Sequence, residues 1–202
     1  VPLGKGKPPP VTPAKAVVSG KVSGKPVKGC VGAVMDRDKL LKPINRDVYE
    51  MVTTLPRLDH WIGRAREEGI VCVDTETTSL DAMQAKLCGV SLAVAPNEAA
   101  YLPLGHREAS DSEASGLFAA KLCGDQMAER DALAALKELL EDTSITKIGH
   151  DVKRDYLVLG TRGVRLGVID DVMLMSYVLD AGKGAHDMAN LSERYFNRSP
   201  SR

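Results

Sequence analysis

The amino-acid sequence predicts an α/β fold, in which helices pack on a mixed β-sheet. Three apolar segments, residues 70–76, 86–95 and 99–105, follow one another with short connections, and strands connected in this way pair antiparallel. From residue 126 onward, helical and strand patterns alternate, as they do in α/β proteins. The sequence therefore predicts a sheet whose first three strands are antiparallel, with flanking helices.

In the first half of the predicted ordered region, the sequence indicates where each helix and strand begins and ends. Alternating apolar residues over 48–54 predict a strand, and residues 55–69 predict a helix. Thr54 is the expected N-cap of this helix, and Gly69 is expected to end it. A Pro-Asn turn at 96–97 joins two strands of the antiparallel meander.

The second half is predicted from leucine spacing and from acidic caps. The clearest helix is 126–142, and residues 106–126 before it are expected to form a surface loop. Asp171 and Asp187 are the expected N-caps of the last two helices. The remaining predicted elements are a strand at 145–150, a helix at 151–163, a strand at 166–170, and helices at 171–182 and 187–196.

The first 43 residues differ in composition from the rest of the chain. Up to Cys30 they contain six lysines and no acidic residue, together with Pro8-Pro9-Pro10 and several glycines. Such a segment buries too little apolar surface to offset the entropy of ordering it. We expect residues 1–43 to be a flexible basic linker, with a polybasic tether near nucleic acid as the alternative, and residues 44–202 to form one domain.

Charge, cysteines and hydropathy bear on the compartment. The net charge is zero, so the overall charge does not indicate a nucleic-acid partner. The four cysteines show no CxxC spacing, and Cys72 falls in an apolar strand, where a buried thiol is common. No apolar run reaches transmembrane length, and the start of the chain is not a signal peptide. We expect a cytoplasmic protein, monomeric and without a membrane partner.

Two carboxylates, Asp74 and Glu76, stand where the strand at 70–76 is expected to end. Side chains at positions i and i+2 of a strand share one face, so both acids point the same way. Carboxylates this close raise each other's pKa unless a cation lies between them. Hard divalent cations such as Mg²⁺ or Mn²⁺ suit oxygen ligands. Taken alone, the pair fits a metal site and a solvated strand-to-turn transition equally well.

A third acid favours the metal site. Asp155 lies one turn into the helix that follows the strand at 145–150, and it can project toward Asp74 and Glu76. Asp151, one turn earlier, is explained more simply as a helix N-cap than as a ligand. His150 is a candidate base, although a single histidine at a strand end is more often structural.

Three segments closely resemble the proofreading 3′→5′ exonuclease domain of bacterial family A DNA polymerases: VCVDTETTSLD (71–81), KIGHDVKRDYLVL (147–159) and DDVMLMSYVLDAGKGAHDMANLSERY (170–195). The segment AAYLPLGH and the helix ending in ELLED fall in matching order. The resemblance covers about residues 44–198. It implies a ribonuclease H-like fold, removal of mismatched 3′-terminal nucleotides during replication and repair, and a cytoplasmic location near the nucleoid.

The resemblance also implies roles for individual residues. Asp74 and Glu76 match the first acidic motif and Asp155 the second, which together bind two divalent ions, Mg²⁺ or Mn²⁺. In such sites the ions activate a water on one side and stabilise the departing 3′-oxygen on the other. Asp74 is expected to bridge both ions, Glu76 to hold the one beside the nucleophile, and Asp155 to position the second through water. The residues expected to contact substrate are Thr77, Leu80, His150, Asp151 and Arg154.

The partners follow from the same resemblance. Single-stranded or frayed 3′ ends of DNA are the expected substrate, held by backbone and apolar contacts rather than by reading of bases. Polymerase and 5′-nuclease domains are expected in a longer parent chain.

The sequence departs from the family pattern in several places. The third family motif, a Tyr followed four residues later by an Asp, does not occur, because Ser199 follows Tyr195 at that spacing. We therefore expect a piece of a longer polymerase that is inactive alone. Asp151, Arg154 and Ala185 stand where the family usually has Asn, an aromatic residue and often a basic residue. The carboxylate at 151 could repel phosphate or tighten metal binding, and Arg154 could restore a phosphate contact.

Three other functions fit part of the pattern. A ribonuclease D-like exoribonuclease has the same acids, but the basic linker and the AAYLPLGH and HDM matches favour the polymerase. A non-catalytic exonuclease-like module predicts loss of the acids, which are present. A phosphatase with an Asp nucleophile normally has a second Asp at i+2, and Glu76 is one methylene longer.

Overall fold

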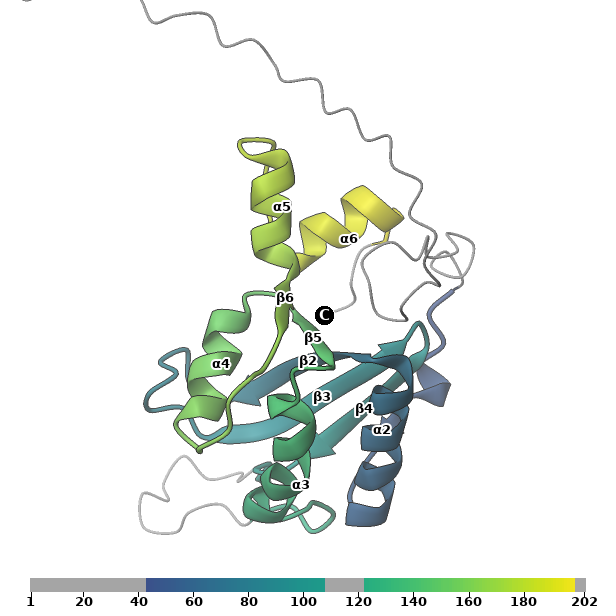
Figure 1. The fold of residues 1–202 in the computed structure, drawn as a ribbon, viewed down its shortest axis with the longest axis vertical. Coiled ribbons are helices and arrows are strands. Elements are labelled where there is room, and N and C mark those ends of the chain that lie inside the picture. The colour runs from purple at the N-terminus through teal and green to yellow at the C-terminus, as the bar shows by residue number, and fades with distance from the viewer. Residues whose placement is uncertain (1–42, 108–121, 199–202) are drawn as a thin grey trace, which may run out of the picture.

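The fold is a six-stranded mixed sheet with helices packed on it, as a computed structural model of residues 43–107 and 122–198 shows (Figure 1). The predicted basic linker and most of the predicted loop at 106–126 lie outside these described residues. Across the sheet the strands run in the order β1-β4-β3-β2-β5-β6. They are β1 (Glu50–Met51), β2 (Ile70–Thr77), β3 (Leu87–Ala95), β4 (Glu98–Pro103), β5 (Thr146–Gly149) and β6 (Ile169–Asp171).

The strand directions confirm the predicted mixed sheet. β2, β3 and β4 pair antiparallel, because short turns connect them. β5 pairs parallel with β2 and with β6, and each of these connections passes through a helix. β2 therefore lies between an antiparallel and a parallel neighbour.

The helices follow the predicted order. They are α2 (Leu55–Glu68), α3 (Glu129–Glu141), α4 (Val152–Gly160), α5 (Val172–Asp180) and α6 (Met188–Phe196). Thr54 occupies the N-cap position of α2 without a side-chain capping bond, and Gly69 ends the helix in the left-handed conformation, with φ of 70°. Asp171 and Asp187 cap α5 and α6 through their side chains, as predicted.

Two predicted elements are shorter than expected, for local reasons. The strand predicted at 48–54 is reduced to two residues, because Asn45 accepts a hydrogen bond from the Asp47 N–H and starts a 3₁₀ turn at Arg46–Val48. The helix predicted from residue 126 begins at Glu129. The side chain of Gln126 donates to the carbonyls of His106 and Cys123, which holds this segment in a turn.

The core fills one face of the sheet. Val73 pairs with Leu92 across β2 and β3, and Leu92 pairs with Ala100 on β4, so these buried side chains share a face. α2, α3 and α4 contribute the opposing layer of buried side chains. In Figure 1, α2 and α3 lie next to each other beside the sheet.

The other face of the sheet is more open. Cys72, Asp74 and Glu76 alternate with the core residues of β2 and point to this face. The expectation that Cys72 is buried is therefore wrong; its side chain is exposed. α5 and α6 project beyond the sheet in Figure 1. None of the helices in the described parts of the chain has both the length and the apolar character needed to cross a membrane.

Candidate active site

The acidic pair stands at the carboxyl end of β2. Asp74 lies opposite Ser91 and Glu76 opposite Gly89, all on the open face of the sheet. The pairing of β2 with β3 shifts register directly after Glu76, so the strand ends in an irregularity immediately beyond the acids. Both carboxylates are exposed and share a face, as the i, i+2 spacing predicts.

Asp155 reaches the same strand from its free edge. β5 pairs with β2 only as far as Cys72, and beyond that point the edge of β2 is open to α4. There the Asp155 carboxylate accepts hydrogen bonds from the backbone N–H of Thr75 at 3.0 Å and from its hydroxyl at 2.5 Å. Asp155 is buried, and both of these hydrogen bonds go to its Oδ1. The structure thus brings all three predicted acids to the end of β2.

Gly149 makes this close approach possible. It is the last residue of β5, where the chain turns into α4. A Cβ atom there would lie 2.6 Å from the Val152 side chain and 3.1 Å from the carbonyl oxygen of Val73. A residue with a side chain would therefore push the start of α4, and Asp155 with it, away from β2.

The three carboxylates influence one another's charge. Although Asp74 is accessible to solvent, partial desolvation by the protein around its carboxyl group raises its pKa, and the charge of Glu76 raises it further, whereas the Arg154 guanidinium lowers it. Burial also raises the pKa of Asp155; the hydrogen bond from Thr75 opposes this rise, and the charge of Asp74 adds to it. Bringing a positive charge to this position would favour the ionised form of both aspartates.

The carboxylate oxygens of the three acids suit a hard divalent cation, although they do not converge on a single position. Asp74 and Glu76 offer carboxylate oxygens on one face, and Asp155 sits at the strand edge beside them. Within residues 43–107 and 122–198, no three His, Cys, Asp or Glu side chains are grouped so that they could hold a metal ion together. The alternation of β2 explains this arrangement, because Thr75, the partner of Asp155, lies between the two acids in sequence and faces the core.

Asp151 does not cap α4 with its side chain, contrary to the prediction. It occupies the N-cap position in a left-handed conformation, with φ of 56° and an exposed side chain that makes no capping bond. The N–H groups of Asp151 and Val152 donate instead to the carboxylate of Asp171, at 3.2 and 2.9 Å. The side chain of Asp151 is thereby left exposed at the entrance to α4.

Of the proposed substrate contacts, Thr77 is the last residue of β2 and Leu80 lies in the turn that follows it. Leu80 is 88% exposed, an unusual position for a large apolar side chain. Arg154 donates hydrogen bonds to the Thr77 hydroxyl and to the carbonyl oxygen of Ser79, the latter at 2.9 Å. The guanidinium predicted to contact phosphate is therefore already bound to this turn.

His150 is held by the loop between α5 and α6. Its Nε2 lies 2.8 Å from the carbonyl oxygen of His186, and because a carbonyl only accepts, this nitrogen carries a proton. His186 is itself buried, with Nδ1 2.7 Å from the Ser176 hydroxyl and its ring stacked on Tyr177. The His150 ring thus has a structural partner and still borders the open face beside Asp74.

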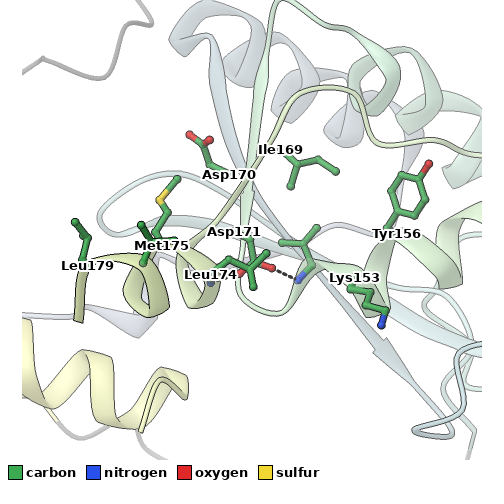
Figure 2. A pocket seen from close by; sticks show the side chains of 10 residues that line it. Lys153, Tyr156, Ile169, Asp170, Asp171, Leu174, Met175 and Leu179 are labelled. Atoms are coloured by element: carbon green, nitrogen blue, oxygen red, sulfur yellow. Dashed lines mark hydrogen bonds between the residues drawn. The ribbon is translucent and has the colours of Figure 1, made fainter. Parts of the chain in front are cut away.

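A hollow of about 760 Å³ on the open face includes Asp74, one of the three acids, in its lining. It is lined by Asp74 and His150, by apolar residues of the sheet, and by α5 and α6. A different hollow, shown in Figure 2, lies between α4, β6 and α5 and contains none of the three predicted acids. Of these two hollows, only the first is lined by one of the predicted acids.

Sequence reasoning missed a polar pair on the open face. The Tyr101 hydroxyl lies 2.6 Å from Nε2 of His106. The tyrosine reaches over Gly89, the residue opposite Glu76, and the charge of Glu76 contributes to a raised pKa of Tyr101, after burial. Only the cross-strand register brings Tyr101 near Glu76, and nothing in the linear sequence signals it.

Comparison with known proteins decides the family. A family model described as 3′-5′ exonuclease, of the type found in family A DNA polymerases, matches residues 49–201. The chain belongs to this 3′-5′ exonuclease family. The exonuclease chain is 46% identical over 167 residues to DNA polymerase I of Rhizobium leguminosarum, a match that covers 78% of this chain. It spans only 16% of the length of that relative.

Solved structures confirm the ribonuclease H-like fold. RNase D of Escherichia coli, an exoribonuclease involved in structured RNA processing, matches with a TM-score of 0.55 and 19% identity, over 76% of this exonuclease chain and 34% of its own. NrnC of Brucella melitensis with bound Mg²⁺ matches with a TM-score of 0.54 and 22% identity, over 76% of this chain and 63% of its own. At these identities the likeness shows the fold alone.

Proposed function

We propose that this chain supplies the 3′→5′ exonuclease activity of a DNA polymerase I-type protein and removes nucleotides from 3′ ends of DNA. One observation carries the proposal: Asp74 and Glu76 share the open face at the end of β2, while Asp155 is bonded to Thr75 between them. The family match and the identity to a DNA polymerase I support DNA as the substrate.

We propose that Asp74 and Glu76, with Asp155 beside them, hold divalent ions such as Mg²⁺ or Mn²⁺. Bound divalent ions make a water nucleophilic at neutral pH and stabilise a departing oxygen. The structure supports this proposal by fixing the positions of the acids: Asp74 and Glu76 lie on a central strand, and two hydrogen bonds hold Asp155 beside them.

The substrate end is proposed to enter the hollow between the sheet and α5 and α6. The exposed Leu80 would pack against the terminal base, while Thr77 and His150 would lie near the sugar and phosphate. Stacking and backbone contacts of this kind do not read the base sequence. The proposed enzyme is therefore indifferent to sequence, and single-stranded or frayed ends suit it best.

The test is Asp74→Ala in the full-length protein that contains this chain. Removing a direct metal ligand should lower nucleotide release from 3′-labelled single-stranded DNA by more than about 100-fold. Losses of up to about 100-fold already follow when only a residue that hydrogen-bonds to a metal ligand is changed. Release should also stop in excess chelator and return with Mg²⁺. Polymerisation by the variant should be unaffected.

Asp59→Ala is the matched control, because Asp59 is an exposed aspartate on α2, away from the hollow. Undiminished DNA hydrolysis by Asp74→Ala, or in excess chelator, would refute the proposal. Hydrolysis of RNA ends at a rate equal to or above that of DNA ends would favour an exoribonuclease.

A further inference from the structure

Arg154 joins helix α4 to the turn after β2. Its Nη2 donates to two acceptors, the hydroxyl of Thr77 at the end of β2 and the carbonyl oxygen of Ser79 in the turn. These partners lie 77 and 75 residues away in sequence. Arg154 directly precedes Asp155 on α4. Its hydrogen bonds therefore connect the helix that carries the third acid to the turn after β2.

The turn is organised around the same two acceptors. The Thr77 hydroxyl donates to the Ser79 carbonyl at 3.1 Å, and the Ser79 hydroxyl accepts from the N–H of Asp81 at 3.1 Å. Leu80 lies between these residues and points to solvent. Nothing in the described chain packs over Leu80, so its position depends on the backbone on either side of it.

The guanidinium occupies this place at a cost. Its Nε–H is buried and has no hydrogen-bond partner within the described residues. A buried donor without a partner is unfavourable, whereas charge-assisted hydrogen bonds such as those of Nη2 are strong. The contact with the turn therefore determines where the side chain lies, and Arg154 is not free to follow a phosphate.

We propose that Arg154 is a positioning residue that fixes the turn carrying Leu80 to the helix carrying Asp155. Leu80 and Asp155 then keep a constant distance from each other. A DNA 3′ end that packs on Leu80 therefore places its terminal phosphodiester at the carboxylates. The role of Leu80 rests on the proposed function, whereas the link between the turn and α4 rests on the contacts alone.

Hydrogen exchange in the full-length protein tests the link without reference to activity. In Arg154→Gln, the amides of residues 78–81 should exchange roughly tenfold faster than in the wild type, because the loss of a charge-assisted bond permits local opening. Lys153→Gln, at the exposed position before Arg154, is the control and should leave this segment unchanged. Unaltered exchange in Arg154→Gln would overturn the proposal.

Kinetics test what the link does. Arg154→Gln should lower kcat/KM for single-stranded DNA about tenfold, because a mobile turn binds the terminal base less firmly and places the phosphodiester less accurately at the carboxylates. Arg154→Lys, which keeps one charged donor, should recover part of the loss. Thr77→Val removes one of the two acceptors and should have a similar effect. The two substitutions together should not be additive, because they break the same contact. Thr77→Val alone also tests the link if Arg154→Gln does not fold.

Two outcomes separate the alternatives. If Arg154 bound DNA phosphate instead, Arg154→Gln would reduce the salt dependence of KM while exchange in residues 78–81 stayed normal, which contradicts the proposal. If the wild-type protein released no nucleotides from DNA, the proposed function would fail, while faster exchange in Arg154→Gln would still establish the link.

Discussion

Residues without a side chain create room for functional groups on the open face. Gly89 pairs with Glu76 and lies beneath Tyr101; a Cβ atom there would be 2.1 Å from the tyrosine hydroxyl. Tyr101 in turn holds His106. The absence of a side chain at position 89 therefore determines which polar groups can stand beside Glu76.

Gly89→Ala should lower the free energy of unfolding by about 1–3 kcal/mol, the usual cost of overpacking, because Tyr101 must leave its place. Chemical denaturation measures this change. Gly124→Ala is the control, since its added methyl group would meet no atom within 4 Å. Equal stability of the two variants would contradict the crowding seen around Gly89.

At the scale of elements, one side chain organises two helices. The Asp171 carboxylate accepts hydrogen bonds from the N–H groups of Met173 and Leu174 at the start of α5. It also accepts from the N–H groups of Asp151 and Val152 at the start of α4. Figure 2 shows Asp171 at this junction. The N-termini of the two helices are therefore tied to each other through one carboxylate.

Asp171→Ala should destabilise the protein by about 2 kcal/mol, roughly twice the usual cost of losing one N-cap, because two helix starts lose their acceptor. Asp187→Ala is the comparison, as Asp187 caps α6 alone. Thermal unfolding of both variants measures the difference. A loss for Asp171→Ala no greater than that for Asp187→Ala would mean that the bonds to α4 add nothing.

At the scale of the whole molecule, the two faces of the sheet are covered unequally. α2, α3 and α4 bury a continuous core against one face. α5 is apolar around most of its surface, yet Ser176 is its only buried residue among those described. Val178 is 84% exposed and Leu179 is 74% exposed. The free energy that holds the fold together therefore comes mainly from the face opposite the acids.

Leu136→Ala should lower the free energy of unfolding by about 2–5 kcal/mol, because Leu136 is fully buried on α3 and its loss leaves a cavity. Val178→Ala, a truncation on the exposed surface of α5, should change it by less than about 0.5 kcal/mol. Denaturant titrations of the two variants provide the measurement. Similar losses at both sites would show that α5 is covered in solution.

The sequence predicted most of the fold because the relevant signals are local. Apolar segments with short connections predicted β2, β3 and β4, and leucine spacing predicted α3. The failures come from contacts that are distant in sequence. Asp151 was expected to cap α4, but its place as acceptor is taken by Asp171, twenty residues later. The error at Cys72 is different, because the i, i+2 spacing already sets its side chain on the same face as Asp74.

The candidate site was predictable to a similar degree. The shared face of Asp74 and Glu76 follows from strand geometry, and the arrival of Asp155 follows from the order of strand and helix. The contact of Arg154 with Thr77 and the place of Tyr101 beside Glu76 both depend on which segments become neighbours after folding. These residues were therefore assigned other roles or none.

The short outer strands of the sheet have a consequence for how copies of this chain behave when crowded. β1 has two residues and β6 has three, so each border of the sheet offers only a brief row of unpaired backbone groups. A long, flat border would template cross-chain pairing and fibril growth. Here the longest strands, β2 and β3, lie inside the sheet, and the part of β2 beyond Cys72 is next to α4. Two molecules that meet briefly therefore have little unpaired strand backbone through which to pair.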